Sequence, residues 1–357
     1  MTIKINSELS CKICGSNRLE RLRSKSIFFP SHSENRILPN HKNYLCNNCG
    51  VVSMLPQPDQ SLLDDLYKST YRNTNFAIAL PDDNVIDLPI QFPESAQSFA
   101  RFQNFIPCYE AIDGGLNEKS FVVDLGGYQG MFLYGMRAAY GVEGCVLDFN
   151  ENGISHARDA LGFNESRVID SPFNLNLSRK ADLVTMVHAF EHMTDPVELL
   201  QYIHSDVLID DGYLFIEVPN LFGAPLCDPT HMFMYSEDSL RYVVEKGGFE
   251  VIKSYKAGSK TADFGLSNSE LVIGCIAKKM QLGNHNGVLP SVVTVKSVNQ
   301  SYRKHSRQVL VSELRNIFKR LFRLIYFISI EYGLALLPGH LDSKMRWLKK
   351  KISFRLN

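Results

Sequence analysis

The sequence predicts an α/β fold built on a seven-stranded, mostly parallel sheet, and three observations support this prediction. Between about residues 120 and 280, short apolar runs alternate with amphipathic stretches of helical spacing, which is the pattern of repeated βαβ units. Acidic residues or glycines stand at the ends of the first few of these apolar runs, where strands are expected to end. The last two apolar runs have no helical stretch between them, so they should form an antiparallel hairpin at the sheet edge.

The elements expected from this pattern begin with a leading helix at residues 94–112. We expect strands at residues 121–124, 145–148, 167–170, 183–187, 213–218, 250–255 and 271–278. Between them we expect helices at residues 131–140, 153–161, 196–208 and 236–246. The start at Pro196 has the strongest local signal, because proline suits the first helical position and Asp195 before it can accept hydrogen bonds from free amides.

Four of the eight cysteines form two CxxC pairs near the N-terminus, Cys11 with Cys14 and Cys46 with Cys49, and a glycine follows each pair. Four thiolates satisfy a tetrahedral zinc ion and leave no open position, which indicates a structural metal. Two incidental cysteine pairs, or a redox role for one CxxC, are the alternatives, although neither pair stands at a strand-to-helix turn. We therefore expect a zinc ribbon at residues 1–56.

A glycine-rich turn follows the first expected strand, in which Asp124 is succeeded by Gly126, Gly127 and Gly130. Glycines let the backbone approach a ligand, and the helix start that follows favours an anion. The dinucleotide fingerprint requires glycine at position 125, where leucine stands. An acid followed by x-G-x-x-x-G is instead typical of methyltransferases, in which the methionine carboxylate of S-adenosylmethionine replaces the pyrophosphate.

Two further acids end strands at the same edge of the expected sheet. Asp148 stands 22 positions after Gly126, where a carboxylate can accept hydrogen bonds from two ribose hydroxyls. Asp170 ends the third strand and could meet the adenine amino group. The alternative for both is a solvated or helix-capping acid.

The segment at residues 181–196, which contains His188 and His192, resembles the part after the fourth strand of class I S-adenosylmethionine-dependent methyltransferases. Residues 212–220 resemble the fifth strand of that family. With the glycine turn and Asp148, these matches cover about residues 120–280. The resemblance implies a Rossmann-like domain there and S-adenosylmethionine as the cofactor, with His188 as a wall of its pocket.

The part before residue 73 looks like the family of zinc-ribbon sugar methyltransferases, which includes deoxysugar C-methyltransferases. That family carries histidines at the positions of His192 and His231, and both are candidate catalytic residues here, although His192 stands just before a helix cap and could instead orient the loop. Histidine titrates near neutrality, so His231 is the candidate general base, with acceptor positioning or a structural role as alternatives. Cys227 and Thr230 replace a tyrosine and a glutamate of the C-methylating members, which favours O-methylation of a nucleotide-linked sugar or surface-glycan precursor.

Charge separates the end of the chain from the rest. Residues 301–357 contain 13 Lys and Arg but 3 Asp and Glu, whereas residues 1–300 contain 25 and 35. We expect a linker or lid with the leading helix at residues 57–119, and a basic helical tail at residues 281–357. The tail could dock on the acidic body, on an anionic membrane surface or on an anionic polymer.

The expected location is cytoplasmic, because no apolar stretch has the length of a signal peptide or a membrane span. Peripheral contact with the inner membrane surface is one role for the tail. Two other functions stay open at this point: a zinc-ribbon RNA methyltransferase, which the acidic body disfavours, and a non-catalytic scaffold of the same fold.

Overall fold

A computed structural model describes residues 9–22, 42–58, 93–223, 231–258, 271–281 and 293–301. The chain divides into two units, Met1–His305 and Ser306–Asn357, and every described residue belongs to the first. Nearly all of the expected basic tail and most of the expected linker therefore lie outside the described residues. So do Cys227 and Thr230. Within the described ranges, no helix is both long and apolar enough to cross a membrane.

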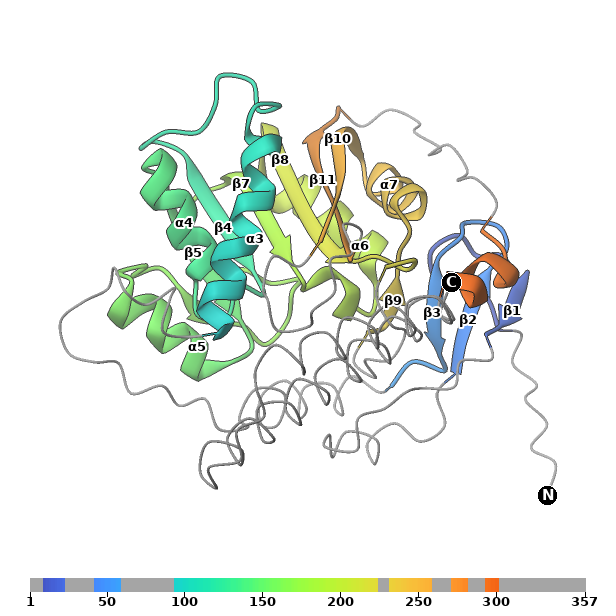
Figure 1. The fold of residues 1–357 in the computed structure, drawn as a ribbon. Helices are drawn as coiled ribbons and strands as arrows, with labels where there is room; N and C mark the ends of the chain where they lie inside the picture. Colours follow the sequence, from blue (N-terminus) through green and yellow to red (C-terminus); the bar gives the residue numbers. More distant parts are fainter. Residues whose placement is uncertain are drawn as a thin grey trace, which may run out of the picture. The chain divides into compact units, whose positions relative to one another are not determined.

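A seven-stranded sheet forms the centre of the fold (Figure 1). Its order is β10-β11-β8-β7-β4-β5-β6, and the five strands from β8 to β6 are parallel. β11 pairs antiparallel with both β8 and β10, so the expected hairpin is confirmed. The strand bounds are β4 Phe121–Leu125, β5 Glu143–Asp148, β6 Arg167–Val168, β7 Ala181–Val187, β8 Leu208–Pro219, β10 Phe249–Ala257 and β11 Val272–Lys279.

Helices cover both faces of this sheet, as the Rossmann-like prediction requires. Successive strand residues point to opposite faces, so Val122 packs with Phe105 of α3 and Phe132 of α4, while Val123 shares a core with α6 and α7. All of β4 is buried, as expected for a central parallel strand. The helix bounds are α3 Pro93–Tyr109, α4 Met131–Tyr140, α5 Glu151–Ser155, α6 Pro196–Tyr202 and α7 Glu237–Lys246, and π-helical turns continue α5 to Ala160 and α6 to Val207.

Two local predictions need correction. Strand β6 ends at Val168, so Asp170 is not a strand end but lies two residues beyond it and is exposed. Asp195 precedes α6 as expected, but its side chain does not cap the helix. Its backbone torsions (φ −132°, ψ 69°) lie outside the usual cap region, and its carboxylate instead accepts a hydrogen bond from Lys12 Nζ at 3.1 Å.

The cysteine-containing segment forms a second sheet of order β1-β2-β3-β9. The first three strands come from the N-terminal part: β1 Leu19–Arg21, β2 Lys42–Cys46 and β3 Val52–Leu55. The fourth, β9 (Phe233–Met234), comes from the connection between β8 and α7, and Met54 N donates to Met232 O at 2.9 Å. Strand β9 was not among the expected strands, and it extends the ribbon into the larger fold.

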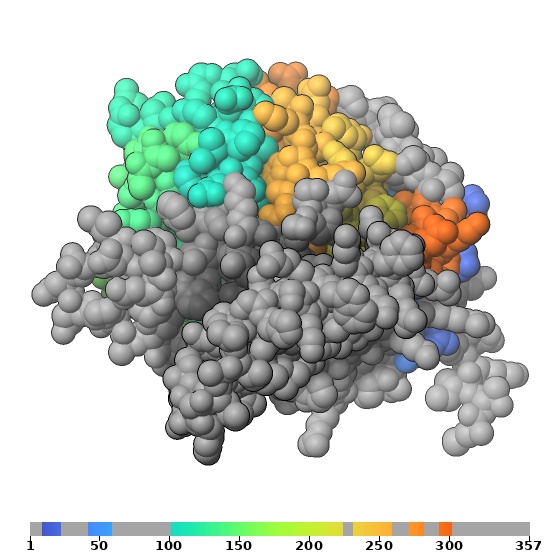
Figure 2. Space-filling model, in the orientation of Figure 1, coloured from blue at the N-terminus to red at the C-terminus, as the bar shows by residue number. Residues whose placement is uncertain are grey.

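Residues 295–301 form a short helix that also belongs to this region. Val298 is fully buried in a cluster with Leu45 and Val52 of the ribbon and Leu221 after β8. Figure 2 shows these orange residues against the blue N-terminal segment. The start of the expected tail is therefore part of the folded body.

Candidate active site

The four predicted cysteines converge at one point in the ribbon. Cys11 Sγ lies 3.6 Å from Cys49 Sγ, and Cys14 Sγ lies 3.5 Å from Cys46 Sγ, with all four sulfurs within 4.8 Å of one another. Zinc–sulfur bonds of ~2.3 Å in a tetrahedron place sulfurs ~3.8 Å apart. The glycines after the two pairs adopt φ of 72° and 70°, which closes each knuckle. The donor set and its spacing fit a structural zinc ion.

The four thiols shift one another's pKa. Hydrogen bonds among the thiols, with burial acting in the same direction, hold the pKa of Cys11 and of Cys49 above the ordinary thiol value. Hydrogen bonds from neighbouring thiols hold the pKa of Cys14 and of Cys46 below it, against the effect of burial. The protein alone therefore keeps part of the cluster protonated. A bound divalent cation favours the thiolate form of all four.

The glycine turn connects β4 with α4 and has no room for side chains. Gly126 and Gly130 adopt φ of 77° and 78°. A Cβ at Gly127 would lie 2.3 Å from Asp124 Oδ2, and one at Gly126 would lie 2.5 Å from Ala189 Cβ. Helix α4 begins at Gly130 without a hydrogen bond from a capping side chain. A helix start of this kind, with no capping side chain on its first amides, suits an anion.

Asp124 is a buried acid at this turn. The residue is 1% exposed. Its Oδ1 accepts a hydrogen bond from Thr185 Oγ1 at 2.7 Å, and its Oδ2 has no hydrogen-bond partner among the described residues. Burial raises the pKa of Asp124 to about 7, against the effect of Thr185. A buried carboxylate oxygen beside a glycine turn fits a ligand that carries a positive charge.

Asp148 links the turns after β4 and β5. Its Oδ2 accepts from Tyr128 N and its Oδ1 accepts from Asn150 N, each at 2.9 Å. These two amides fix the direction of the carboxylate, whose oxygens have further lone pairs for hydroxyl donors. Asp170 follows β6, the next strand outward, at the same edge of the sheet.

His188 follows β7 in a left-handed conformation (φ 54°) and faces two buried acids. Its Nε2 lies 3.4 Å from Glu217 Oε1, and its Nδ1 lies 3.6 Å from Glu191 Oε1. Burial, with the nearby Arg101 cation, lowers the pKa of His188 to about 4, so the imidazole is neutral at pH 7. Ala189 beside it contacts Gly126, which puts this segment directly against the glycine turn.

His192 and His231 come together although 39 positions separate them in the chain. Their ring centroids lie 4.9 Å apart at 71°, and each Nε2 lies 3.9 Å from Glu191 Oε1. The two side chains are 10% and 15% exposed, whereas that of Glu191 is 2% exposed. The pair therefore lies at the accessible side of a buried carboxylate.

Glu191 and Glu217 are further residues of this site that no sequence motif indicated. Glu217 Oε2 accepts from Asn104 Nδ2 at 2.8 Å and from Tyr255 Oη at 2.7 Å. Burial acts to raise the pKa of Glu217, but the facing His188 imidazole and the Tyr255 hydroxyl outweigh it, and the pKa lies below its usual value. The available signal was an acid inside the apolar run 213–218 of strand β8, because such an acid requires buried partners.

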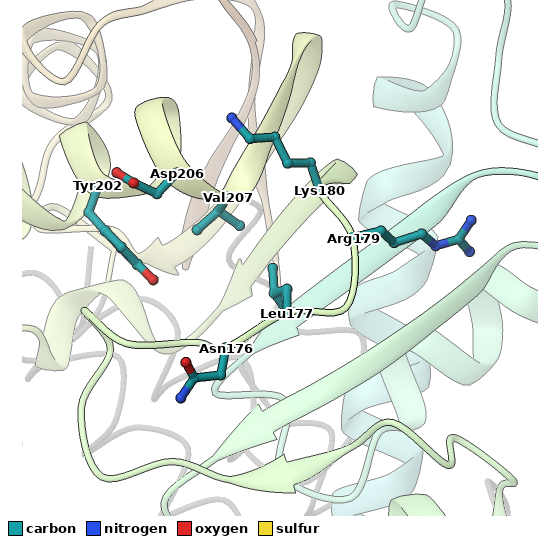
Figure 3. A pocket seen from close by; sticks show the side chains of 7 residues that line it. All are labelled: Asn176, Leu177, Arg179, Lys180, Tyr202, Asp206 and Val207. Carbon is teal, nitrogen blue, oxygen red and sulfur yellow. The ribbon is translucent and has the colours of Figure 1, made fainter.

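A separate cavity of about 250 Å³ opens at the other end of the sheet, where β7 begins and the helix after β7 ends. Its lining residues are Asn176, Leu177, Arg179, Lys180, Tyr202, Asp206 and Val207. Figure 3 shows Arg179 pointing away from Tyr202 and Asp206. The cavity is remote from the glycine turn, because the two ends of a parallel strand lie on opposite edges of the sheet.

Comparison with known proteins supports the interpretation of this domain. Residues 109–254 match the family model described as "Methyltransferase domain", which confirms the predicted enzyme class for that part of the chain. No curated protein matches the chain.

Solved structures with a similar fold include several methyltransferases. Magnesium protoporphyrin IX methyltransferase from Synechocystis PCC 6803 with bound SAH is 16% identical, with a TM-score of 0.43, over 62% of this chain and 100% of that chain. An S-adenosylmethionine-dependent methyltransferase from Aquifex aeolicus is 20% identical, with a TM-score of 0.39, over 52% and 95%. The complex between the Haloferax volcanii Trm112 methyltransferase activator and a putative methyltransferase gives 16% identity and a TM-score of 0.39 over 52% and 97%.

Proposed function

We propose that the protein transfers a methyl group from S-adenosylmethionine to a hydroxyl of a small acceptor, which is a nucleotide-linked sugar or a surface-glycan precursor. One observation carries the proposal. The glycine turn touches Ala189, and Ala189 belongs to the same short segment as His192, whose ring meets that of His231. A donor held at the turn would thus lie beside polar groups suited to an acceptor hydroxyl.

The donor would be held by residues at the carboxyl edge of the sheet. Gly126, Gly127 and Gly130 would admit its methionine part next to Asp124, and Asp148 would accept from the ribose hydroxyls. Asp170 would meet the adenine, and His188 would form a wall of the pocket. When bound, the donor supplies a methyl group already activated by the sulfonium charge.

On the acceptor side, the protein has to orient a hydroxyl and remove its proton. His231 would take the proton or position the acceptor, and His192 would assist. The sugar assignment derives from the zinc-ribbon sugar methyltransferases that the front part of the chain resembles. Their shared histidine positions, rather than the shape of a cavity, support it.

Transfer of labelled methyl from S-adenosylmethionine to a panel of nucleotide-linked sugars tests this function. Methylation of at least one sugar at a hydroxyl supports it, and product analysis distinguishes an O-methyl from a C-methyl group. Methylation of RNA instead would establish the nucleic-acid alternative. Absence of S-adenosylmethionine binding would leave a non-catalytic scaffold.

Asp148→Ala is expected to weaken S-adenosylmethionine binding by about 1.5 to 3 kcal/mol, the value of hydrogen bonds to a charged acceptor. Titration calorimetry measures this loss. Asp182→Ala is a useful comparison, because Asp182 accepts from Phe121 N at the opposite end of β4. Tighter binding of NAD than of S-adenosylmethionine by the wild type would contradict the cofactor assignment.

The affinity for S-adenosylmethionine is expected to rise about 5-fold from pH 6 to pH 7, because Asp124 with a pKa of about 7 must ionise to face the donor's ammonium group. In the protein without ligand, the raised pKa of Asp124 makes folding less favourable as the pH rises. Protonated Asp124 contributes its full stabilisation below the unfolded-state pKa near 4, and this contribution is lost as the pH rises through 7. Calorimetry at both pH values, repeated with Asp124→Asn, separates the two effects, since the amide variant should show no such rise.

The domain division at residues 56, 119 and 280 is part of this proposal, as is a cytoplasmic location with the basic tail at an anionic membrane surface. We expect a chain that ends at Leu310 to bind S-adenosylmethionine normally but to lose co-sedimentation with phosphatidylserine vesicles. Failure of the shortened chain to fold would place the tail in the core and remove the basis for the membrane contact.

A further inference from the structure

We propose that Glu191, His192 and His231 bind a divalent transition-metal ion at the acceptor side of the active site, separate from the ion expected at the four cysteines. The binding of the ion stands on the geometry of these side chains. Only its role in catalysis rests on the proposed function.

Glu191 lies too far from either imidazole for a hydrogen bond with it, and slightly beyond the spacing of two ligands of one ion. Glu191 Oε1 lies 3.9 Å from Nε2 of His192 and 3.9 Å from Nε2 of His231, and all three ligand atoms lie within 4.8 Å of one another. Hydrogen bonds would need about 2.7 to 3.2 Å. Ligands at about 2.1 Å from a shared ion lie about 3.0 to 3.4 Å apart, so modest rotations of the two imidazoles would complete the site.

The donor set matches a known chemical preference. Two imidazoles with one carboxylate suit iron, zinc, manganese or cobalt in the divalent state, and this set leaves coordination positions open. Glu191 is 1% exposed, and the negative charge of a carboxylate buried in this way favours a nearby cation. His188 Nδ1, at 3.6 Å from the same oxygen, adds a third imidazole beside it.

Both segments that carry the ligands are held by packing. Phe190 is fully buried and stacks on Tyr235 with centroids 5.5 Å apart, which anchors the short helical turn Phe190–His192. His231 directly precedes Met232, whose carbonyl accepts from Met54 N of the ribbon. Ligands fixed in this way lose little freedom when an ion binds.

The open positions would be filled by the acceptor, which points to a substrate with two neighbouring oxygens, such as a vicinal diol. Coordination lowers the pKa of a bound hydroxyl. The oxygen would then form the new bond to the methyl carbon while the sulfur–methyl bond breaks, and the hydroxyl proton leaves to solvent. In this arrangement His231 positions the ion rather than taking the proton.

Cobalt titration of the full-length protein, followed by absorption spectroscopy and metal analysis, tests the site without an activity assay. The wild type is expected to bind two Co²⁺ per chain, one with thiolate charge-transfer bands and one with only weak ligand-field bands. The His192→Ala/His231→Ala double variant should keep the thiolate-bound ion and lose the other. Glu198→Gln is the matched control, because this acid is exposed on α6 and should leave both ions bound.

One cobalt per wild-type chain, or two in the double variant with an unchanged circular dichroism spectrum, would overturn the metal site. Single His192→Ala and His231→Ala variants cover the case in which the double variant does not fold, and each should weaken the second site at least 10-fold. Two bound ions without sugar methylation would refute the proposed acceptor and leave this inference standing. Sugar methylation with one bound ion would support the proposed acceptor and refute the second metal site.

Discussion

His231→Ala is expected to lower the turnover of methyl transfer by ~10² to 10⁴-fold while the affinity for S-adenosylmethionine stays nearly unchanged. The reason is the position of His231 on the acceptor side of the site. His231 lies against His192 and Glu191, whereas Asp124 accepts from Thr185 and Asp148 accepts from Tyr128 and Asn150. Steady-state kinetics with calorimetric cofactor titration measures the two quantities separately.

His192→Ala distinguishes the two roles that His231 could have. If His231 alone takes the proton, the His192 variant keeps most of its turnover and the His231 variant does not. If both histidines bind one ion, the two variants lose turnover to a similar extent, and added Co²⁺ partly restores each. Near-normal turnover in both variants would show that orientation of the acceptor alone is sufficient.

Cys46→Ser is expected to abolish zinc binding at the ribbon and to lower the melting temperature of the whole described fold. Structural zinc sites contribute about 10 to 16 kcal/mol of apparent binding free energy in small modules, and here Cys46 shares a core with residues of the main domain. Turnover should fall as well, because β3 pairs with β9, which starts two residues after His231. Metal analysis and thermal unfolding monitored by circular dichroism measure the effects.

Asn48→Ser is the control for this change, since Asn48 lies in the same knuckle and offers no thiolate. It should retain one zinc ion and near-normal stability. A wild-type protein without zinc, or a Cys46→Ser variant that melts normally, would contradict a structural zinc site.

The main sheet could be predicted because its signals are local. The bounds expected for α4 match the observed Met131–Tyr140, since Gly130 and Gly141 take left-handed conformations at its two ends and these glycines are visible in the sequence. β9 could not be predicted in the same way. Two residues have no recognisable period, and their conformation is set by pairing with β3 about 180 positions earlier.

The same distinction applies to the site. The glycine turn, Asp148 and the cysteine pairs each have a recognisable spacing, and the structure brings each set together. Glu217 was missed because its partners, Tyr255 on β10 and Asn104 on α3, come from other elements. Glu191 was missed because its contact with His231 joins two segments that are far apart in the chain. Asp195 shows the converse, since a side chain suited to capping accepts a hydrogen bond from Lys12 instead.

The pairing of β3 with β9 has a consequence for biosynthesis. The ribbon is made first, yet its edge strand β3 has no partner on that side until Met234 has been added. At about 5 to 20 residues per second, this interval is roughly 10 to 40 seconds. During that time the growing chain carries an open strand edge, which is prone to pair with other chains. Binding of zinc early in synthesis would keep strands β1, β2 and β3 folded until β9 has been made.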